Sequence, residues 1–425
     1  MSAPFSDRKA WLQTTGGVVG VLLLVQFLTG ILLAFYYVPS VDHAHTTVSY
    51  IEKVVSSGSW LRSLHHYGSQ WLALFVFLHV VRLFLSKAYV NRTLAWIVAV
   101  VMLGLVMAAA GTGYSLPWDA RAFFSTRVAE GLMSGLPLVG RNARFWVLGG
   151  NDISTITLSR FFAVHVLIVP FAIMGVIAWQ FGRRACWTNL SRNAIVGGVV
   201  FVALAIWCAK FPAPLGPAVE AMTADYLPRP GAQFLWLYEL LKYVPGGLGS
   251  IVGVILPGMG LAILLLLPRL KAQRLLGSTV LGVLTAGIVT MTIVSYVSDR
   301  SNSHTREQLA RQTAEEAKWR SEPFNPQLLQ ASQRESQTTS AAPVMYTKFC
   351  VNCHGPHGEG AQQGTLRFPP LLDVAAKPRR TTEDIVSLLK DPTAYGLEPP
   401  MRSFKDKLTE EQMREIAAWV VQLKR

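Results

Sequence analysis

Residues 65–86 read HHYGSQWLALFVFLHVVRLFLS, and this stretch decides the fold class. As a helix it would be about 33 Å long at roughly 1.5 Å per residue, enough to cross the roughly 30 Å hydrocarbon core of a membrane. It contains three histidines, among them His65 and His79. Ionisable groups are costly at that depth and usually serve a function. The stretch therefore predicts a membrane helix that carries a functional site.

Six further apolar segments accompany this one, so we expect an all-α, polytopic helix bundle of about seven transmembrane helices. The first segment is too long for the core of a signal peptide and lacks a small-residue cleavage site, so we expect it to be retained. The expected spans are residues 16–37, 65–86, 95–115, 158–181, 193–209, 248–267 and 275–297.

Charge divides the chain of 425 residues into two regions. Charged residues make up 15% of it, against about 25% in a typical soluble domain, and hydrophobic residues 51%. Residues 1–296 hold 21 basic and 9 acidic side chains, whereas residues 297–425 hold 18 and 16. This pattern excludes a disordered chain, a disulfide scaffold and a purely cytosolic enzyme. Most of the net charge of +14 lies in the apolar region. We therefore attribute it to membrane topology and expect no nucleic-acid partner.

Basic residues concentrate in alternate connections between the expected spans. Segments 1–15, 87–94, 182–192 and 268–274 together hold ten basic residues and one acidic residue. The other three connections hold nine basic and eight acidic residues. The positive-inside rule then places the N-terminus in the cytoplasm and, after seven crossings, everything beyond residue 297 outside.

Four parts follow from this organisation: residues 1–190 with four helices, 191–297 with three, a linker at 298–342 and a small helical domain at 343–425. The linker is rich in Ser, Gln, Glu and Arg, and its stretch 306–320 could form a polar helix. The final domain closes with an amphipathic helix from Thr409.

The final domain carries the most specific motif, Cys350-Val351-Asn352-Cys353-His354. This is the attachment pattern for c-type haem, in which two thiols bond the haem and the adjacent imidazole ligates iron. A zinc site would need two further ligands, and only one more histidine lies nearby. Met401, in a proline-rich loop before the last helix, is the expected second axial ligand, and Met413 is expected to be core packing. Together these features resemble a class I monohaem cytochrome c.

Three histidines within the expected spans are arranged for haem. His65 and His79 are 14 positions apart, which on a helix returns to within about 40° of the same face after a rise of roughly 21 Å. They could hold two stacked haems, one per leaflet. His165 lies at the depth of His65 on an antiparallel helix, and the pair predicts a bis-imidazole haem b at the outer side. We expect His66, which faces elsewhere, to be a polar neighbour.

Residues 11–181 resemble the cytochrome b core of quinol:cytochrome c reductases, closest to the split chloroplast and Gram-positive form. Residues 192–297 resemble subunit IV of the same complexes. The motifs that carry the resemblance are Gln26 to Gly30, Arg62-Ser63-Leu64-His65, His79-Val80-Val81-Arg82, Gly113-Tyr114-Ser115-Leu116-Pro117-Trp118-Asp119, Thr157 to His165, Arg229-Pro230 and Tyr238-Glu239-Leu240-Leu241-Lys242-Tyr243.

The resemblance implies a bacterial cytoplasmic membrane protein that passes electrons between the quinone pool or haem b and an external haem c. It implies at least one haem b and one covalent haem c. As partners it implies quinone or quinol, Rieske-type or other redox subunits, an external cytochrome or other electron acceptor, and membrane lipid, in a dimer or larger complex. No individual catalytic residue is predicted.

One departure from the family concerns the inner haem, on the cytoplasmic side. The family carries a second histidine 14 or 15 positions after the first, where this chain has Trp179 and Gln180, and a glycine where it has Ala99. The inner haem is then either absent, with Trp179 filling its volume, or five-coordinate on His79 with Arg82 available to a propionate. Of these two, we favour the absent haem.

A second departure concerns the outer quinone site. The family motif Pro-Glu-Trp-Tyr supplies a carboxylate, and here the sequence is Pro230-Gly231-Ala232-Gln233. Both departures argue against standard electron bifurcation. Two functions remain: an electron-transfer subunit that reacts with quinol or quinone, or a non-catalytic conduit or structural partner beside a complete cytochrome b. A soluble cytochrome c with a passive anchor would need only one helix.

Overall fold

The computed structural model divides the chain into two compact units, which we describe separately. It describes residues 14–150, 153–181, 190–219, 226–271, 273–326, 343–355, 358, 360–363, 366–371, 374, 380–395, 401 and 403–423. The first unit contains residues up to Val219 and from Leu227 to Leu329, and the second contains the carboxyl-terminal region from Gln330. Residues 182–189, which include Cys186, lie outside the described residues.

The first unit contains seven helical spans long and apolar enough to cross a membrane, which confirms the prediction of a polytopic bundle. Short helices α5 (Ala88–Asn91) and α12 (Ala232–Lys242) connect some of them. The spans are α2 (Thr15–Ala34), α4 (Gly58–Leu85), α6 (Thr93–Tyr114), Thr155–Trp179 of α9 and α10, Arg192–Lys210 of α11 (Leu190–Lys210), α13 with its flanking turns (Gly246–Arg269) and α14 (Gln273–Ser301).

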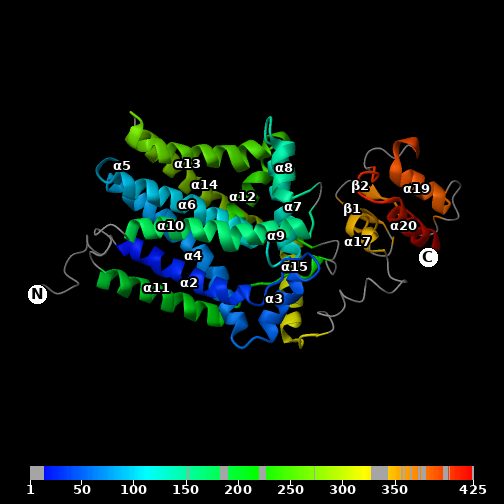
Figure 1. Ribbon diagram of the computed structural model, residues 1–425, viewed down its shortest axis with the longest axis horizontal. Helices are drawn as coiled ribbons and strands as arrows, with labels where there is room; N and C mark the ends of the chain where they lie inside the picture. The colour runs from blue at the N-terminus through cyan, green and yellow to red at the C-terminus, as the bar shows by residue number, and fades with distance from the viewer. Residues whose placement is uncertain are drawn as a thin grey trace, which may run out of the picture. The chain divides into compact units, whose positions relative to one another are not determined.

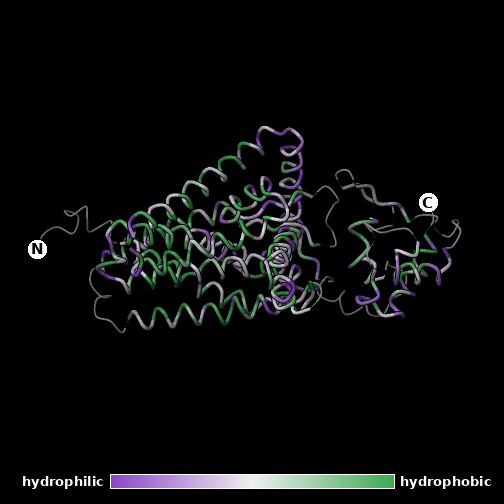
Figure 2. Tube along the Cα trace, turned by 90° about the horizontal axis from the view of Figure 1, so that it is seen from above, coloured by the Kyte–Doolittle hydropathy of each residue, from purple (hydrophilic) through white to green (hydrophobic). Residues whose placement is uncertain are grey.

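Apolar packing joins the first four spans and α11 into one core. Its buried members come from α2, α4, α6, α10 and α11, and include Leu22, Val76, Val106, Ile173 and Leu204. In Figure 1 these helices run side by side, with α11 against α2. Figure 2 shows hydrophobic residues along the lengths of the helices and hydrophilic ones at both ends of the bundle. This distribution suits a unit with a lipid-facing belt.

Two spans contain a π turn, and each turn lies just before a proline. The turn Val164–Ile168 joins α9 (Thr155–Ala163) to α10 (Val169–Phe181), and the turn Ile251–Ile255 precedes α13 (Leu256–Leu266). Pro170 and Pro257 follow two residues later. Proline lacks the N–H that an α-helix would use there, and its ring crowds the preceding turn. A wider turn relieves that crowding and adds one residue to the helix path.

Shorter helices cover one end of the bundle: α3 (Ala44–Lys53), α7 (Ala120–Ser134), α8 (Gly140–Leu148) and α15 (Ser303–Ser321). Helix α15 lies in the predicted linker, yet it packs on the membrane unit. Its Arg320 pairs with Glu52 at 3.2 Å, and its Glu316 pairs with Arg121 at 3.2 Å. The Glu52 side chain is only 2% exposed and also pairs with Arg62. A buried carboxylate held by two guanidinium groups fixes α15 in place.

The second unit is a small helical domain, as expected, and its described residues also include a short antiparallel hairpin. Tyr346 lies at its centre with its ring 4.4 Å from that of Trp419, and Ile416, Ala417 and Val420 of the last helix are buried beside it. Thr409 caps that helix, as predicted. The elements are α17 (Val344–Phe349), α18 (Val351–His354), β1 (Ala361–Gln363) paired antiparallel with β2 (Leu366–Phe368), α19 (Thr382–Lys390) and α20 (Glu410–Gln422).

Candidate haem sites

The structure brings His65 of α4 and His165 of the π turn together. Their ring centroids are 6.0 Å apart, with the ring planes at 82°. A metal held between two imidazoles by bonds of about 2 Å places the ring centres roughly 6 Å apart. The two side chains therefore have the separation needed for axial ligands of one iron. We call this pair the outer site.

One nitrogen of each outer ring is held by a hydrogen bond from the surrounding helices. The Nδ1 atom of His65 lies 2.9 Å from the Thr29 hydroxyl, and Nδ1 of His165 lies 3.0 Å from the Ala109 carbonyl oxygen. Such a bond orients a ligating imidazole and fixes its tautomer. In both rings it leaves Nε2 for the metal.

Glycines make room beside both rings. A Cβ atom at Gly30 would lie 3.1 Å from Cε1 of His65, and one at Gly113 would lie 2.5 Å from Cε1 of His165. The second distance is shorter than real Cβ contacts, so only glycine allows this ring position. The space, the ring separation and the oriented nitrogens together show that the outer site fits a bis-imidazole haem.

The same arrangement recurs around His79, further along the same two helices, α2 and α4. The Thr15 hydroxyl lies 2.8 Å from Nδ1 of His79, and a Cβ at Gly16 would lie 3.3 Å from its Cε1. The pair Thr15-Gly16 precedes Thr29-Gly30 by 14 residues, as His65 precedes His79 by 14. We call His79 with Thr15 and Gly16 the inner half-site.

The opposite side of the inner site departs from the outer one. Because the π turn that contains His165 adds one residue, position 180 of α10, rather than position 179, lies on the same face of the span as His165. Ala99, which is 4% exposed, stands 14 residues before Gly113. The expectation that Trp179 fills the haem volume is not met, because its side chain is 53% exposed. An indole that replaced a porphyrin inside the bundle would be buried.

Arg82 lies one turn beyond His79 on α4. It is half-buried, and its Nε atom has no hydrogen-bond partner among the described residues. A buried guanidinium N–H without a partner is costly unless an acceptor binds it. Arg82 is thus suited to an anionic group, such as the propionate that the sequence assigned to it.

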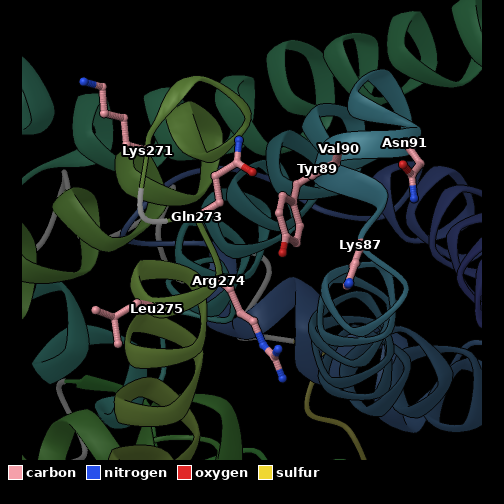
Figure 3. A pocket seen from close by; sticks show the side chains of 8 residues that line it. All are labelled: Lys87, Tyr89, Val90, Asn91, Lys271, Gln273, Arg274 and Leu275. Carbon is pink, nitrogen blue, oxygen red and sulfur yellow. The ribbon is translucent and has the colours of Figure 1, made fainter.

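A basic hollow of about 480 Å³ lies where α5 meets the start of α14, and no histidine lines it. Figure 3 shows Lys87, Tyr89, Val90 and Asn91 on one side and Lys271, Gln273, Arg274 and Leu275 on the other. Its three cations belong to the connections that carry the positive charge excess. The hollow therefore marks one end of the bundle and is not part of either haem site.

In the second unit, Cys350, Cys353 and His354 lie together on and before α18. Burial, with the neighbouring Cys353, raises the pKa of the Cys350 thiol to about 12. Nδ1 of His354 is 2.9 Å from the Pro369 carbonyl oxygen. Burial lowers the pKa of His354, against the opposing effect of its hydrogen bond to Pro369, and so favours the neutral ring. Neutral imidazole with Nε2 free is the form that ligates iron.

Two methionines of this unit have different environments. Met401 is partly buried and packs against the core cluster that contains Cys350. Met413 on α20 is 3% exposed and lies within that core. The placement agrees with the role expected for Met413, and it leaves Met401 as the predicted axial ligand.

The outer quinone motif meets the end of α6. The Gly231 N–H donates to the Tyr114 hydroxyl at 3.0 Å, and a Cβ at Gly231 would lie 3.2 Å from the Tyr114 ring. The Oε1 atom of Gln233 is buried without a hydrogen-bond partner among the described residues. Glu239 is fully buried on α12 but is engaged by Lys242 at 2.6 Å. The motif therefore has no carboxylate at position 231, and the buried carboxylate of Glu239 is already paired with Lys242.

Sequence reasoning missed the residues that orient the rings. Thr15 and Thr29 were not selected, although the repeated Thr-Gly pair with the spacing of the histidines was a visible signal. The Ala109 carbonyl left no such signal, and Pro170 was the only sequence feature that accompanies the π turn. His66 is placed as expected, with its Nε2 atom 3.0 Å from the Gln70 amide nitrogen.

Comparison with known proteins agrees with both units. Residues 2–182 match the family Cytochrome b/b6/petB, and residues 316–424 match the family Cytochrome c. The chain is 36% identical to the menaquinol:cytochrome c reductase cytochrome b subunit of Bacillus subtilis, over 42% of this chain and 80% of that protein. It is 31% identical to cytochrome b of Rickettsia prowazekii, over 62% and 72%, and 35% identical to cytochrome b6 of Prochlorococcus marinus, over 37% and 73%.

Proposed function

Because the chain belongs to the cytochrome b family and ends in a cytochrome c domain, we propose that it moves electrons between a quinone in the membrane and an acceptor outside it. Family membership implies that it binds haem b and haem c. The protein is a multi-pass membrane protein of a cytochrome bc type.

The observation that carries the proposal is the outer pair. His65 and His165 are 6.0 Å apart, and each has one nitrogen oriented by a hydrogen bond. When bound there, haem supplies one-electron transfer. The chain's own part is to present two neutral imidazoles, to exclude water by packing α4 against α6, and to keep space with Gly30 and Gly113.

For the external haem, we propose that Cys350 and Cys353 form the thioether bonds, that His354 ligates iron and that Met401 is the second axial ligand. The charge pattern supports a cytoplasmic N-terminus, with the cytochrome c domain on the outer face of a bacterial cytoplasmic membrane. Rieske-type or other redox subunits and a dimer or larger complex are the partners we propose.

Haem content and redox titration of the purified protein test this function. We expect at least one low-spin haem b and one covalent haem c per chain, and reduction of both by a quinol analogue. A pyridine haemochrome assay that finds no haem b would contradict the proposal.

A second candidate is a non-catalytic electron conduit beside a complete cytochrome b. Gly231 favours it, because a hydrogen atom stands where the usual site provides a proton-accepting carboxylate. Quinol-dependent cytochrome c reduction separates the candidates. Activity of the isolated chain supports the first, whereas activity that requires a second cytochrome b supports the conduit.

A further inference from the structure

We propose that the inner site binds a second haem through His79 alone, and that its other axial position takes a small exogenous ligand such as carbon monoxide or cyanide. This inference rests on the proposed function, since it presupposes haem b in the bundle. It reverses the expectation from sequence, which favoured an absent inner haem.

The first argument is the retained half-site. Thr15 holds Nδ1 of His79 at 2.8 Å, as Thr29 holds Nδ1 of His65 at 2.9 Å. Gly16 keeps space beside His79, as Gly30 does beside His65. A histidine that served only as a polar residue in the membrane would need a hydrogen-bond partner, but it would need no adjacent glycine. Both features together describe a ligand held for a metal.

The second argument is charge. Arg82, one turn from His79, keeps a buried Nε–H without a hydrogen-bond partner in the described part of the chain. A buried N–H without an acceptor is unfavourable, and an anionic group bound beside Arg82 would accept its hydrogen bond. A haem on His79 would bring carboxylates to this region. Arg82 thus indicates, independently of His79, that an anion belongs beside the inner half-site.

The third argument concerns the opposite side, where no imidazole can complete the site. The π turn places position 180 on the face of His165, and that residue is Gln180. Trp179 is 53% exposed and so does not plug the interior. A haem held from one side keeps a coordination position for a ligand from solution. The outer haem, with two imidazoles, does not.

The test uses the full chain in detergent. We expect two haems b for each haem c, one low-spin and one high-spin in the ferric electron paramagnetic resonance spectrum. Carbon monoxide added to the reduced protein should shift the bands of one haem b and leave the low-spin one unchanged. His79→Ala should lower the ratio from two haems b to one and abolish the shift. The matched control His66→Ala, one residue from His65 on the same helix, should keep both.

The outcomes are distinguishable. One low-spin haem b per haem c, with no carbon monoxide shift, overturns the inner site and leaves the proposed function intact. Two low-spin haems b also overturn it. Absence of every low-spin haem b contradicts the proposed function itself. If His79→Ala fails to fold, as judged by loss of the outer low-spin signal, Thr15→Val provides the second variant and should deplete only the high-spin haem.

Discussion

The two halves of the bundle are built from the same helices but differ in how many sides they complete. On α2 and α4, a Thr-Gly pair faces a histidine twice, 14 residues apart, with hydrogen bonds of 2.9 Å and 2.8 Å. On α6 and the span that joins α9 to α10, the outer half has Gly113 and His165, whereas the inner half has Ala99 and Gln180. One helix pair keeps the repeat and the other has lost it. The difference shows that each axial ligand is supported by its own helix pair. One side of a site can therefore change while the other is kept.

The largest expected effect comes from removing the second outer ligand. His165→Ala should abolish the low-spin haem b signal, because His65 alone cannot give bis-imidazole coordination, while haem c stays attached. Haemochrome content and paramagnetic resonance measure this. Leu167→Ala, in the same π turn and at a 52% exposed position, is the control and should change nothing. A low-spin signal that persists in His165→Ala would contradict the assignment of His165 as a ligand of the outer haem.

Restoring the missing side of the inner site is the next largest change. Gln180→His with Ala99→Gly should convert the high-spin haem b to low-spin and remove carbon monoxide binding, because an imidazole then faces His79. Trp179→His with Ala99→Gly is the matched control and should fail, since the π turn rotates position 179 away. Optical spectra with and without carbon monoxide measure both. Conversion to low-spin haem by Trp179→His but not by Gln180→His would show that the π turn does not place position 180 opposite His79.

The cytochrome c unit offers a third pair of axial positions to compare. Met401→Leu should leave the haem attached, lower its midpoint potential within the roughly 0.8 V range that axial ligands span, and remove the weak far-red band of methionine ligation. Met413→Leu should keep that band, because Met413 is buried in the core. Redox titration and ferric absorption spectra measure the two. Loss of the band in Met413→Leu, with the band retained in Met401→Leu, would show that Met413 of the last helix is the ligand.

Smaller effects are expected from the threonines. Loss of a bond that orients a ligand typically costs about 10–100-fold in metal affinity. Thr29→Val should keep nearly full haem, since His165 still holds the other side, whereas Thr15→Val should lose the inner haem on dilution. Haem b retained after repeated washing measures this. Equal losses in both variants would contradict a one-sided inner site.

The smallest expected effect concerns the Glu239–Lys242 ion pair, which lies outside both haem b sites. Burial raises the pKa of Glu239, but the hydrogen bond and charge of Lys242, with a further bond from Tyr243, outweigh it and hold the pKa below its ordinary 4.5. Its stabilising contribution is therefore present above pH 4.5 and lost as the pH falls through the lowered value. The melting-temperature gap to Glu239→Gln should be constant at neutral pH and close in acid. A gap that widens in acid would contradict the ion pair.

The sequence predicted the spans and the outer pair because apolar length and the depth of a histidine depend on residue type and spacing alone. His65 and His165 could be matched by counting from the ends of their segments. Which of residues 179 and 180 lies on the face of His165 could not be predicted from sequence. One added residue in the π turn rotates every later side chain by about 100° around the helix axis. The role of Thr15 depends on which helix faces α4, and packing decides that.

The ion pairs of α15 determine where the membrane unit can be cut. A fragment that stops at residue 297 removes Arg320 from the buried Glu52 and Glu316 from Arg121 and the Leu215 N–H. A fragment that stops at residue 326 keeps all three contacts. A soluble-tail truncation meant to isolate the haem b bundle should therefore end after α15, and the shorter fragment should express as the less stable protein.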